Sequence, residues 1–102
     1  MNREFTKNGL LVQSDDGVIV NTHYNHELAS YELNGEKWIV PWEYVERDGA
    51  IVQLLYINRG AVYKQGALGV PADEAMLNQL REDMLAAFEA LGLRAILRQS
   101  PS

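Results

Sequence analysis

The chain has 102 residues, of which 47% are hydrophobic and 23% are charged, and its formal net charge is −5 at pH 7. This length fits one domain, residues 1–102, and the absence of cysteine excludes disulfides and thiolate metal sites. The acidity argues against binding to nucleic acid or to an anionic membrane, because both ligands need a basic surface.

Turn dipeptides divide the first two thirds of the chain into short segments. Asp16-Gly17, Asn34-Gly35 and Asp48-Gly49 suit hairpin turns, because these residues tolerate a positive φ. β-branched and aromatic residues fill the segments between the turns, as is typical of strands. We therefore expect an antiparallel meander of about five or six strands, at residues 10–13, 18–22, 29–33, 37–45, 50–57 and 61–65, with residues 1–8 frayed.

Both tryptophans lie on the longest of these expected strands. Trp38, Val40, Trp42 and Tyr44 have one parity and therefore lie on one face of the strand. Pro41 lacks an N–H donor, so we expect a bend or a sheet edge there. We expect Trp38 and Val40 to lie in the core. The segment from Trp42 onward is flanked by carboxylates, and we expect it at an exposed rim.

The hydrophobic period changes after Pro71. Apolar residues then recur every three or four positions, which predicts an amphipathic helix of about 20 residues. Gly92 follows the last apolar position and suits a left-handed C-terminal cap. Residues 93–98 could form a final strand or a terminal extension, and residues 99–102 are expected to fray. The pattern favours an α+β fold in which the helix packs on one face of a curled antiparallel sheet.

The sequence contains no signature of catalysis or of metal binding. His23, His26 and Glu27 lie within five residues, but the zinc motifs place such a pair on a helix with a third ligand at a defined spacing. This segment therefore reads as a polar loop, with a pH-dependent contact as the alternative. We expect no catalytic residue, no metal and no cofactor. The N-terminus has no apolar signal-peptide core, so we expect a cytoplasmic protein.

The order of elements resembles that of small immunity proteins from bacterial polymorphic-toxin and contact-dependent growth inhibition systems. In those proteins several short strands precede one amphipathic helix and a terminal strand. The segments that carry the similarity are residues 8–13, 31–38 and 71–92. The resemblance implies a non-enzymatic protein that binds and neutralises a cognate toxin, often a nuclease.

The residues themselves are compatible with a protein-binding inhibitor of a toxin or another basic protein. Tryptophan and tyrosine dominate binding hot spots, and an acidic surface accelerates association with a basic partner. The alternative is a homo-oligomeric or ligand-binding module of phage or regulatory origin, so a monomer and a homodimer both stay open. The predicted partner-binding residues are Trp42, Glu43, Tyr44, Glu46, Asp48, Tyr31 and Glu32.

Overall fold

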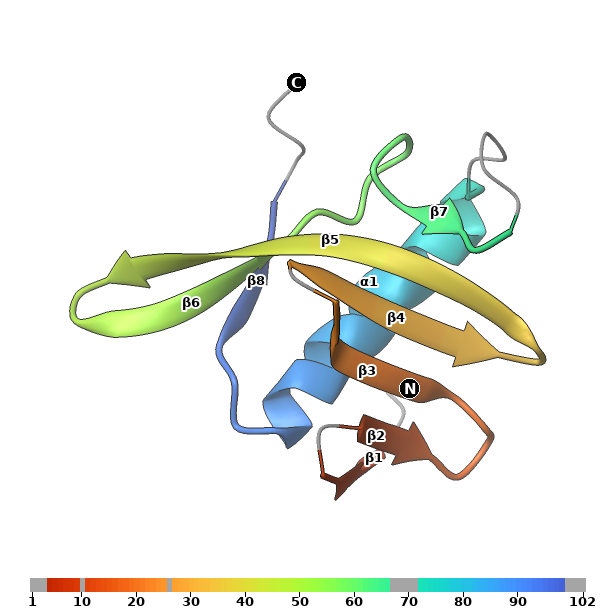
Figure 1. The fold of residues 1–102 in the computed structure, drawn as a ribbon, viewed down its shortest axis with the longest axis horizontal. Coiled ribbons are helices and arrows are strands. Elements are labelled where there is room, and N and C mark those ends of the chain that lie inside the picture. Colours follow the sequence, from red (N-terminus) through yellow and green to blue (C-terminus); the bar gives the residue numbers. More distant parts are fainter. Residues whose placement is uncertain (1–3, 10, 26, 67–71, 99–102) are drawn as a thin grey trace.

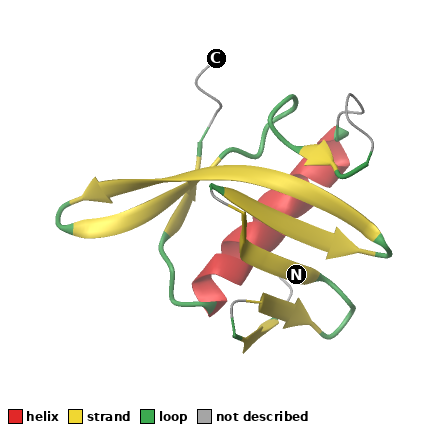
Figure 2. Cartoon of the chain, viewed as in Figure 1, coloured by secondary structure: helices red, strands yellow, loops and turns green. Residues whose placement is uncertain are grey.

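The fold is α+β, with one helix packed on a curled sheet (Figure 1). The computed structural model describes residues 4–9, 11–25, 27–66 and 72–98. Figure 2 shows the helix of these described residues running obliquely across the strands. The elements are β1 (Phe5–Asn8), β2 (Leu11–Ser14), β3 (Ile19–Asn25), β4 (Leu28–Leu33), β5 (Glu36–Arg47), β6 (Ala50–Leu55), β7 (Tyr63–Lys64), α1 (Glu74–Ala90) and β8 (Ala95–Leu97).

The sheet follows the chain order, as the turn dipeptides predict. The strand order is β1-β2-β3-β4-β5-β6-β8, and β7 pairs with β5. Among the named strands of the described residues, the pairs are antiparallel except β6 with β8, which run parallel after the crossover through α1. The expected five or six strands and the possible final strand correspond to β2 through β8 of the described residues, whereas the parallel pairing of β8 departs from the expected antiparallel sheet.

The one strand of the described residues that was not expected lies at the N-terminal end. Residues 5–8, which we expected to be frayed, form β1 and pair with β2 from Phe5↔Ser14 to Asn8↔Leu11. The pairing gives this polar segment backbone hydrogen bonds that compensate for its few apolar side chains. The expected frayed residues 99–102 lie outside the described residues.

Two hairpin turns have the backbone conformation that their sequences predict. Asn34 and Gly35 have φ of 54° and 79°, and Asp48 and Gly49 have φ of 52° and 78°. Two successive positive φ angles are the requirement of a type I′ turn, whose twist matches that of paired strands. These turns set the registers of β4 with β5 and of β5 with β6.

Pro41 marks the point at which β5 changes partner. Residues before it pair with β4, ending at Leu28↔Pro41, and residues after it pair with β6, beginning at Trp42↔Leu55. Pro41 still accepts a hydrogen bond through its carbonyl, from the Tyr56 N–H at 3.0 Å. The strand runs through the proline without interruption, because a proline is tolerated where the ladder changes sides.

The core lies between α1 and the inner face of the sheet, the face that the helix covers. Trp38, Val40 and Trp42 of β5 all belong to this core, as their shared parity predicts. The helix contributes residues at spacings of three and four, which form one apolar stripe. The buried helix residues of this stripe are Leu77, Leu80, Met84, Ala87 and Phe88.

The helix has a defined start and end. The Asp73 side chain caps the N-terminus by accepting a hydrogen bond from the Met76 N–H at 2.8 Å. Gly92 adopts φ of 75° after the last turn, as predicted for a C-terminal cap. Pro71, the predicted start of the helical pattern, lies outside the described residues.

Candidate functional site

The candidate site is the hairpin formed by β5 and β6, which projects away from the helix and the other strands (Figure 1). Glu27, the residue just before β4, accepts a hydrogen bond from the Trp42 N–H of β5 at 3.0 Å. Beyond this point β5 continues to Arg47 and pairs with β6 alone among the described strands. The turn at Asp48-Gly49 forms the tip.

Exposure increases along the inner face of the hairpin from its base to its tip. Trp42 is 4% exposed at the base, whereas Tyr44 is 54% exposed and Ile51 is 66% exposed. Tyr44 pairs with Gln53, and Ile51 pairs with Glu46, so these side chains lie on the same face as Trp42. Two of the three large hydrophobic side chains that are exposed in the described residues therefore lie together on this hairpin; the third is Leu97.

An aromatic cluster fixes the position of Tyr44. Its ring packs edge-on against Trp42, with centroids 4.6 Å apart, and its hydroxyl lies 3.2 Å from His23 Nε2. His23 also packs edge-on against Trp42, at 5.4 Å, and its Nδ1 lies 2.8 Å from the Thr22 hydroxyl. These contacts hold an exposed aromatic side chain in one orientation, which lowers the entropy that binding would cost.

A cavity of about 230 Å³ borders this cluster. Its lining residues are Lys7, Gly9, His23, Leu91 and Leu93. Pockets that enclose a small organic ligand usually measure ~300–1,000 Å³. The cavity is below this range, so the exposed hairpin is the better candidate for recognition.

The outer face of the hairpin, opposite Trp42 and Tyr44, carries a second apolar cluster. Its buried members are Val52, Leu54 and Tyr56. The Tyr56 hydroxyl donates a hydrogen bond to the Glu43 carboxylate. This hydrogen bond raises the pKa of Tyr56 above its ordinary value, and burial and the negative charge of Glu43 act in the same direction. Glu43 thus stabilises the hairpin from the side away from Tyr44.

Two buried polar groups lie at the base of the hairpin. Trp42 Nε1 and Gln53 Nε2 are buried and have no hydrogen-bond acceptor among the described residues. Buried donors without acceptors cost free energy, so neither group is explained by stability alone. Both side chains lie on the inner face, as the pairs Trp42↔Leu55 and Tyr44↔Gln53 require.

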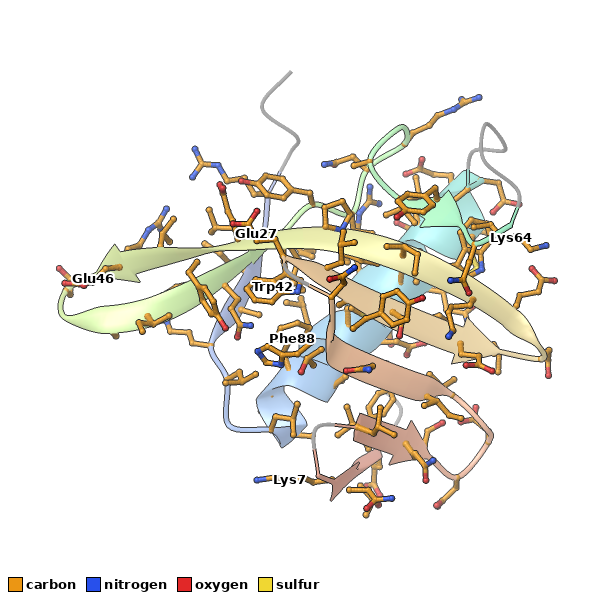
Figure 3. The ribbon with its side chains drawn as sticks, viewed as in Figure 1. Lys7, Glu27, Trp42, Glu46, Lys64 and Phe88 are labelled. Atoms are coloured by element: carbon orange, nitrogen blue, oxygen red, sulfur yellow. The ribbon has the colours of Figure 1, made fainter. Side chains whose placement is uncertain are left out.

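The predicted partner-binding residues occupy several separate places. Tyr44 and Glu46 lie on the inner face of the hairpin, Asp48 lies in its turn and Glu43 lies on the outer face. Figure 3 shows Glu46 at the far end of the hairpin and Trp42 near its base, directed toward Phe88. The prediction that Trp42 lies at an exposed rim is wrong, because its parity continues the core face of β5 past Pro41.

Tyr31 and Glu32 do not join the hairpin. Tyr31 is fully buried on the inner face of β4, where its hydroxyl donates to Asp83 Oδ2 at 2.5 Å. The next residue, Glu32, lies on the opposite face and pairs with Lys37. Tyr31 is therefore a core residue, and its position excludes direct contact with a partner of the folded protein.

Sequence reasoning missed two residues of the site. Ile51 lies opposite Glu46 in the ladder, and the Asp48-Gly49 turn already implied this register. His23 contacts Tyr44 and Trp42 across the sheet, at a distance of 21 positions in sequence from Tyr44. No local pattern around His23 could indicate that contact.

Negative charge surrounds the hairpin. Glu27, Glu43, Glu46 and Asp48 are all exposed near its base or tip; the basic residues nearby are Arg47 in β5 and Arg94 and Arg98, which flank β8 at the base of β6. Figure 3 shows Glu27 beside the middle of β5 and Glu46 at the tip, so carboxylates lie at both ends of this segment. Such a surface attracts a basic partner over several ångströms and raises its association rate.

Other classes of site find no geometric support in the described part of the chain. No group of three or more His, Asp or Glu side chains there is arranged to hold a metal ion. The described helix is too short and too polar to cross a membrane. Comparison of the chain with protein-family models, with curated proteins and with solved structures gave no significant match.

Proposed function

We propose that this chain is a non-enzymatic protein-binding inhibitor that docks a basic partner through the β5–β6 hairpin. The observation that carries the proposal is the pair of exposed apolar side chains, Tyr44 and Ile51, on one face of a projecting hairpin that carries Glu46 and Asp48. Isolated exposed apolar residues are common on proteins, but an oriented tyrosine beside an isoleucine forms a patch suited to a hot spot.

The class of partner follows from charge. A toxin that cleaves nucleic acid needs a basic groove for phosphate, and an acidic hairpin can occupy such a groove. An immunity protein of this kind would act in the cytoplasm, where its toxin must be neutralised. The Tyr44 ring would supply affinity, and the carboxylates would raise the association rate and favour basic partners over others.

The experiment is affinity capture from the native host with the tagged full chain, followed by rescue of growth against any captured toxin. We expect wild-type protein to retain a basic partner and to restore growth. The variant Tyr44→Ala/Ile51→Ala should lose both properties while remaining folded, because both side chains are exposed. Leu97→Ala is the matched control, since it removes the other exposed large apolar side chain in the described residues. Loss in the control and retention in the double variant would contradict the proposal.

A homo-oligomeric module is the second candidate, and the same exposed side chains favour it. Two copies could bury Ile51 and Tyr44 against each other. The charge argues against this arrangement, because Glu46 and Asp48 of the two copies would approach one another. Light scattering separates the candidates, since a tight dimer that dissociates on Ile51→Lys substitution would support the second.

A further inference from the structure

The backbone of β5 directs its polar groups to two edges in alternation. The Tyr56 N–H donates to the Pro41 carbonyl, so the odd-numbered residues of the hairpin segment exchange hydrogen bonds with β6. The Trp42 N–H donates to the Glu27 carbonyl on the other edge. Even-numbered residues beyond Trp42 must therefore also direct their N–H and C=O groups to that other edge.

Tyr44 and Glu46 occupy this edge after its neighbour has ended. The register of β4 with β5 ends at Leu28↔Pro41, and Glu27, which precedes β4, adds the hydrogen bond to Trp42. Among the described residues, the N–H and C=O groups of Tyr44 and Glu46 have no backbone partner. They form a short open strand edge on a hairpin that is otherwise fully paired with β6.

We infer that the partner supplies an extended segment that adds to this edge as a further strand, in line with β4. The inference rests on the proposed function and specifies how the hairpin would bind. Tyr44 and Glu46 offer two donors and two acceptors, which is enough for four main-chain hydrogen bonds. Strand addition of this kind gives affinity through the main chain and specificity through alternate side chains.

The charges around the edge define the composition of the added segment. Glu27 lies at one end, and Glu46 and Asp48 lie at the other. Tyr44 between them presents an aromatic ring on the inner face. A segment in which lysine or arginine alternates with an apolar residue places its apolar side chains on the inner face beside Tyr44 and its charges on the outer face, where Glu43 lies.

A second copy of this chain is a poorer occupant of the same edge. Antiparallel pairing of two such edges brings Glu46 of one copy toward the acidic hairpin of the other. Like charges placed across a strand pair are destabilising. Natural proteins protect open edges with charged residues for this reason, and Glu46 prevents self-pairing while it attracts a basic segment.

The test uses the isotope-labelled full chain and two amidated heptapeptides, one alternating lysine with valine and the other glutamate with valine. We expect the lysine peptide to shift the amide resonances of Tyr44 and Glu46 and to slow their hydrogen exchange by about tenfold or more, which corresponds to about 1.4 kcal/mol of added protection. The glutamate peptide should leave both amides unchanged. Shifts confined to other strands would overturn the inference.

A pair of substitutions at one position separates the main chain from the side chain. Glu46→Pro removes the N–H that faces the open edge but no hydrogen bond of the hairpin ladder. Glu46→Gln removes the charge and keeps the N–H. We expect the proline variant to weaken lysine-peptide binding about tenfold further than the glutamine variant does. Equal weakening of binding in both variants would contradict strand addition. Hydrogen exchange of the Tyr44 amide in the wild-type protein tests the same inference without any substitution.

The outcomes also distinguish this inference from the proposed function. A captured partner that is lost by Tyr44→Ala/Ile51→Ala but retained by Glu46→Pro would overturn strand addition and leave hairpin docking in place. A partner retained by both variants would overturn both. Protection of Tyr44 and Glu46 that rises with protein concentration, without any peptide, would identify a second copy as the occupant and overturn the inference.

Discussion

Tyr31 illustrates how the position of one residue in the sheet decides its role. Its ring is fully buried under α1, and its hydroxyl donates to Asp83 Oδ2 and accepts from Gln79 Nε2 at 3.0 Å. A buried carboxylate requires such donors, because transferring it from water is costly. Tyr31 thus connects β4 to the helix and supports the fold on which the hairpin rests.

Removal of the Tyr31 hydroxyl should destabilise the protein without changing its surface. We expect Tyr31→Phe to lower the free energy of unfolding by ~1–3 kcal/mol, because Asp83 loses a charge-assisted hydrogen bond while it stays buried. Urea denaturation measures this change. Tyr63→Phe is the control and should change the free energy by less than ~0.5 kcal/mol, since the Tyr63 hydroxyl makes no hydrogen bond within the described residues. Equal changes in the two variants would contradict the role of Tyr31.

The contact between Tyr56 and Glu43 predicts a pH dependence at alkaline pH. The pKa of Tyr56 is raised in the folded state, first by the hydrogen bond to Glu43 and then by burial. The folded protein therefore holds the phenolic proton more tightly than the unfolded chain does. The resulting stabilisation is complete below the unfolded pKa of about 10 and is lost as the pH rises through the folded pKa.

Glu43→Gln should reduce this effect. We expect the pKa of Tyr56 in the variant to move back toward its ordinary value, because the main cause of the shift is removed. Nuclear magnetic resonance titration of the Tyr56 ring carbons measures this pKa apart from those of the other four tyrosines. Glu46→Gln removes a carboxylate of the same hairpin that does not contact Tyr56 and should leave the titration unchanged. An identical Tyr56 titration in the wild type and in Glu43→Gln would show that the Glu43 carboxylate does not affect the pKa of Tyr56.

At the level of elements, the hairpin depends on its turn. Gly49 has φ of 78°, and a Cβ built on it would meet no atom within 4 Å. A side chain at this position therefore meets no steric obstacle, and any cost must come from the left-handed backbone itself. The stability of the turn can be tested without disturbing the packing around it.

Gly49→Ala should lower stability by ~1–2 kcal/mol, because alanine resists the left-handed conformation. For a domain of this size, each kcal/mol shifts the thermal midpoint by about 4–8 °C, so calorimetry detects the change. Asp48→Asn is the control, since asparagine accepts positive φ as readily as aspartate, and it should be nearly neutral. An unchanged midpoint in Gly49→Ala would mean that the turn does not constrain the hairpin.

The elements that could be predicted from sequence are those specified by local chemistry. Asn34-Gly35 and Asp48-Gly49 predicted two hairpins, and the spacing from Leu77 to Phe88 predicted the helix and its buried face. A final strand was one of two possibilities for residues 93–98, and β8 (Ala95–Leu97) is that strand. Each of these features depends on a turn residue or on a hydrophobic period, which a single sequence displays directly.

The features that sequence could not predict depend on contacts between distant segments. The parallel pairing of β8 with β6 follows from the path of α1 across the sheet, which no local pattern specifies. β1 is polar apart from Phe5, and it is held by pairing with β2 and by the packing of Phe5 against the core. Trp42 was expected at a rim because Pro41 and Glu43 flank it, yet the helix covers the face on which it lies. The polar neighbour Glu43 lies on the opposite face of β5, so its polarity carries no information about the burial of Trp42.

At the scale of the whole molecule, the helix covers one end of the inner face and leaves the β5–β6 hairpin uncovered (Figure 1). Trp42 anchors this hairpin to the core, because its side chain belongs to the same buried cluster as Phe88 of α1. The net charge of −5 gives the whole protein an attraction for basic surfaces, and the carboxylates near the hairpin concentrate it there. Rigid anchoring, an exposed apolar pair and local negative charge together make the hairpin the proposed docking element.

The central claim, that the hairpin docks a basic partner, is tested most directly by calorimetric titration of the captured partner into wild-type protein and into Tyr44→Ala/Ile51→Ala. We predict that the double variant raises the dissociation constant by about 100-fold or more, which corresponds to ~2.7 kcal/mol or more lost from the two hot-spot side chains together. Leu97→Ala should bind within about threefold of wild type, as expected for a residue outside the interface. Equal dissociation constants for wild type and the double variant would contradict the claim.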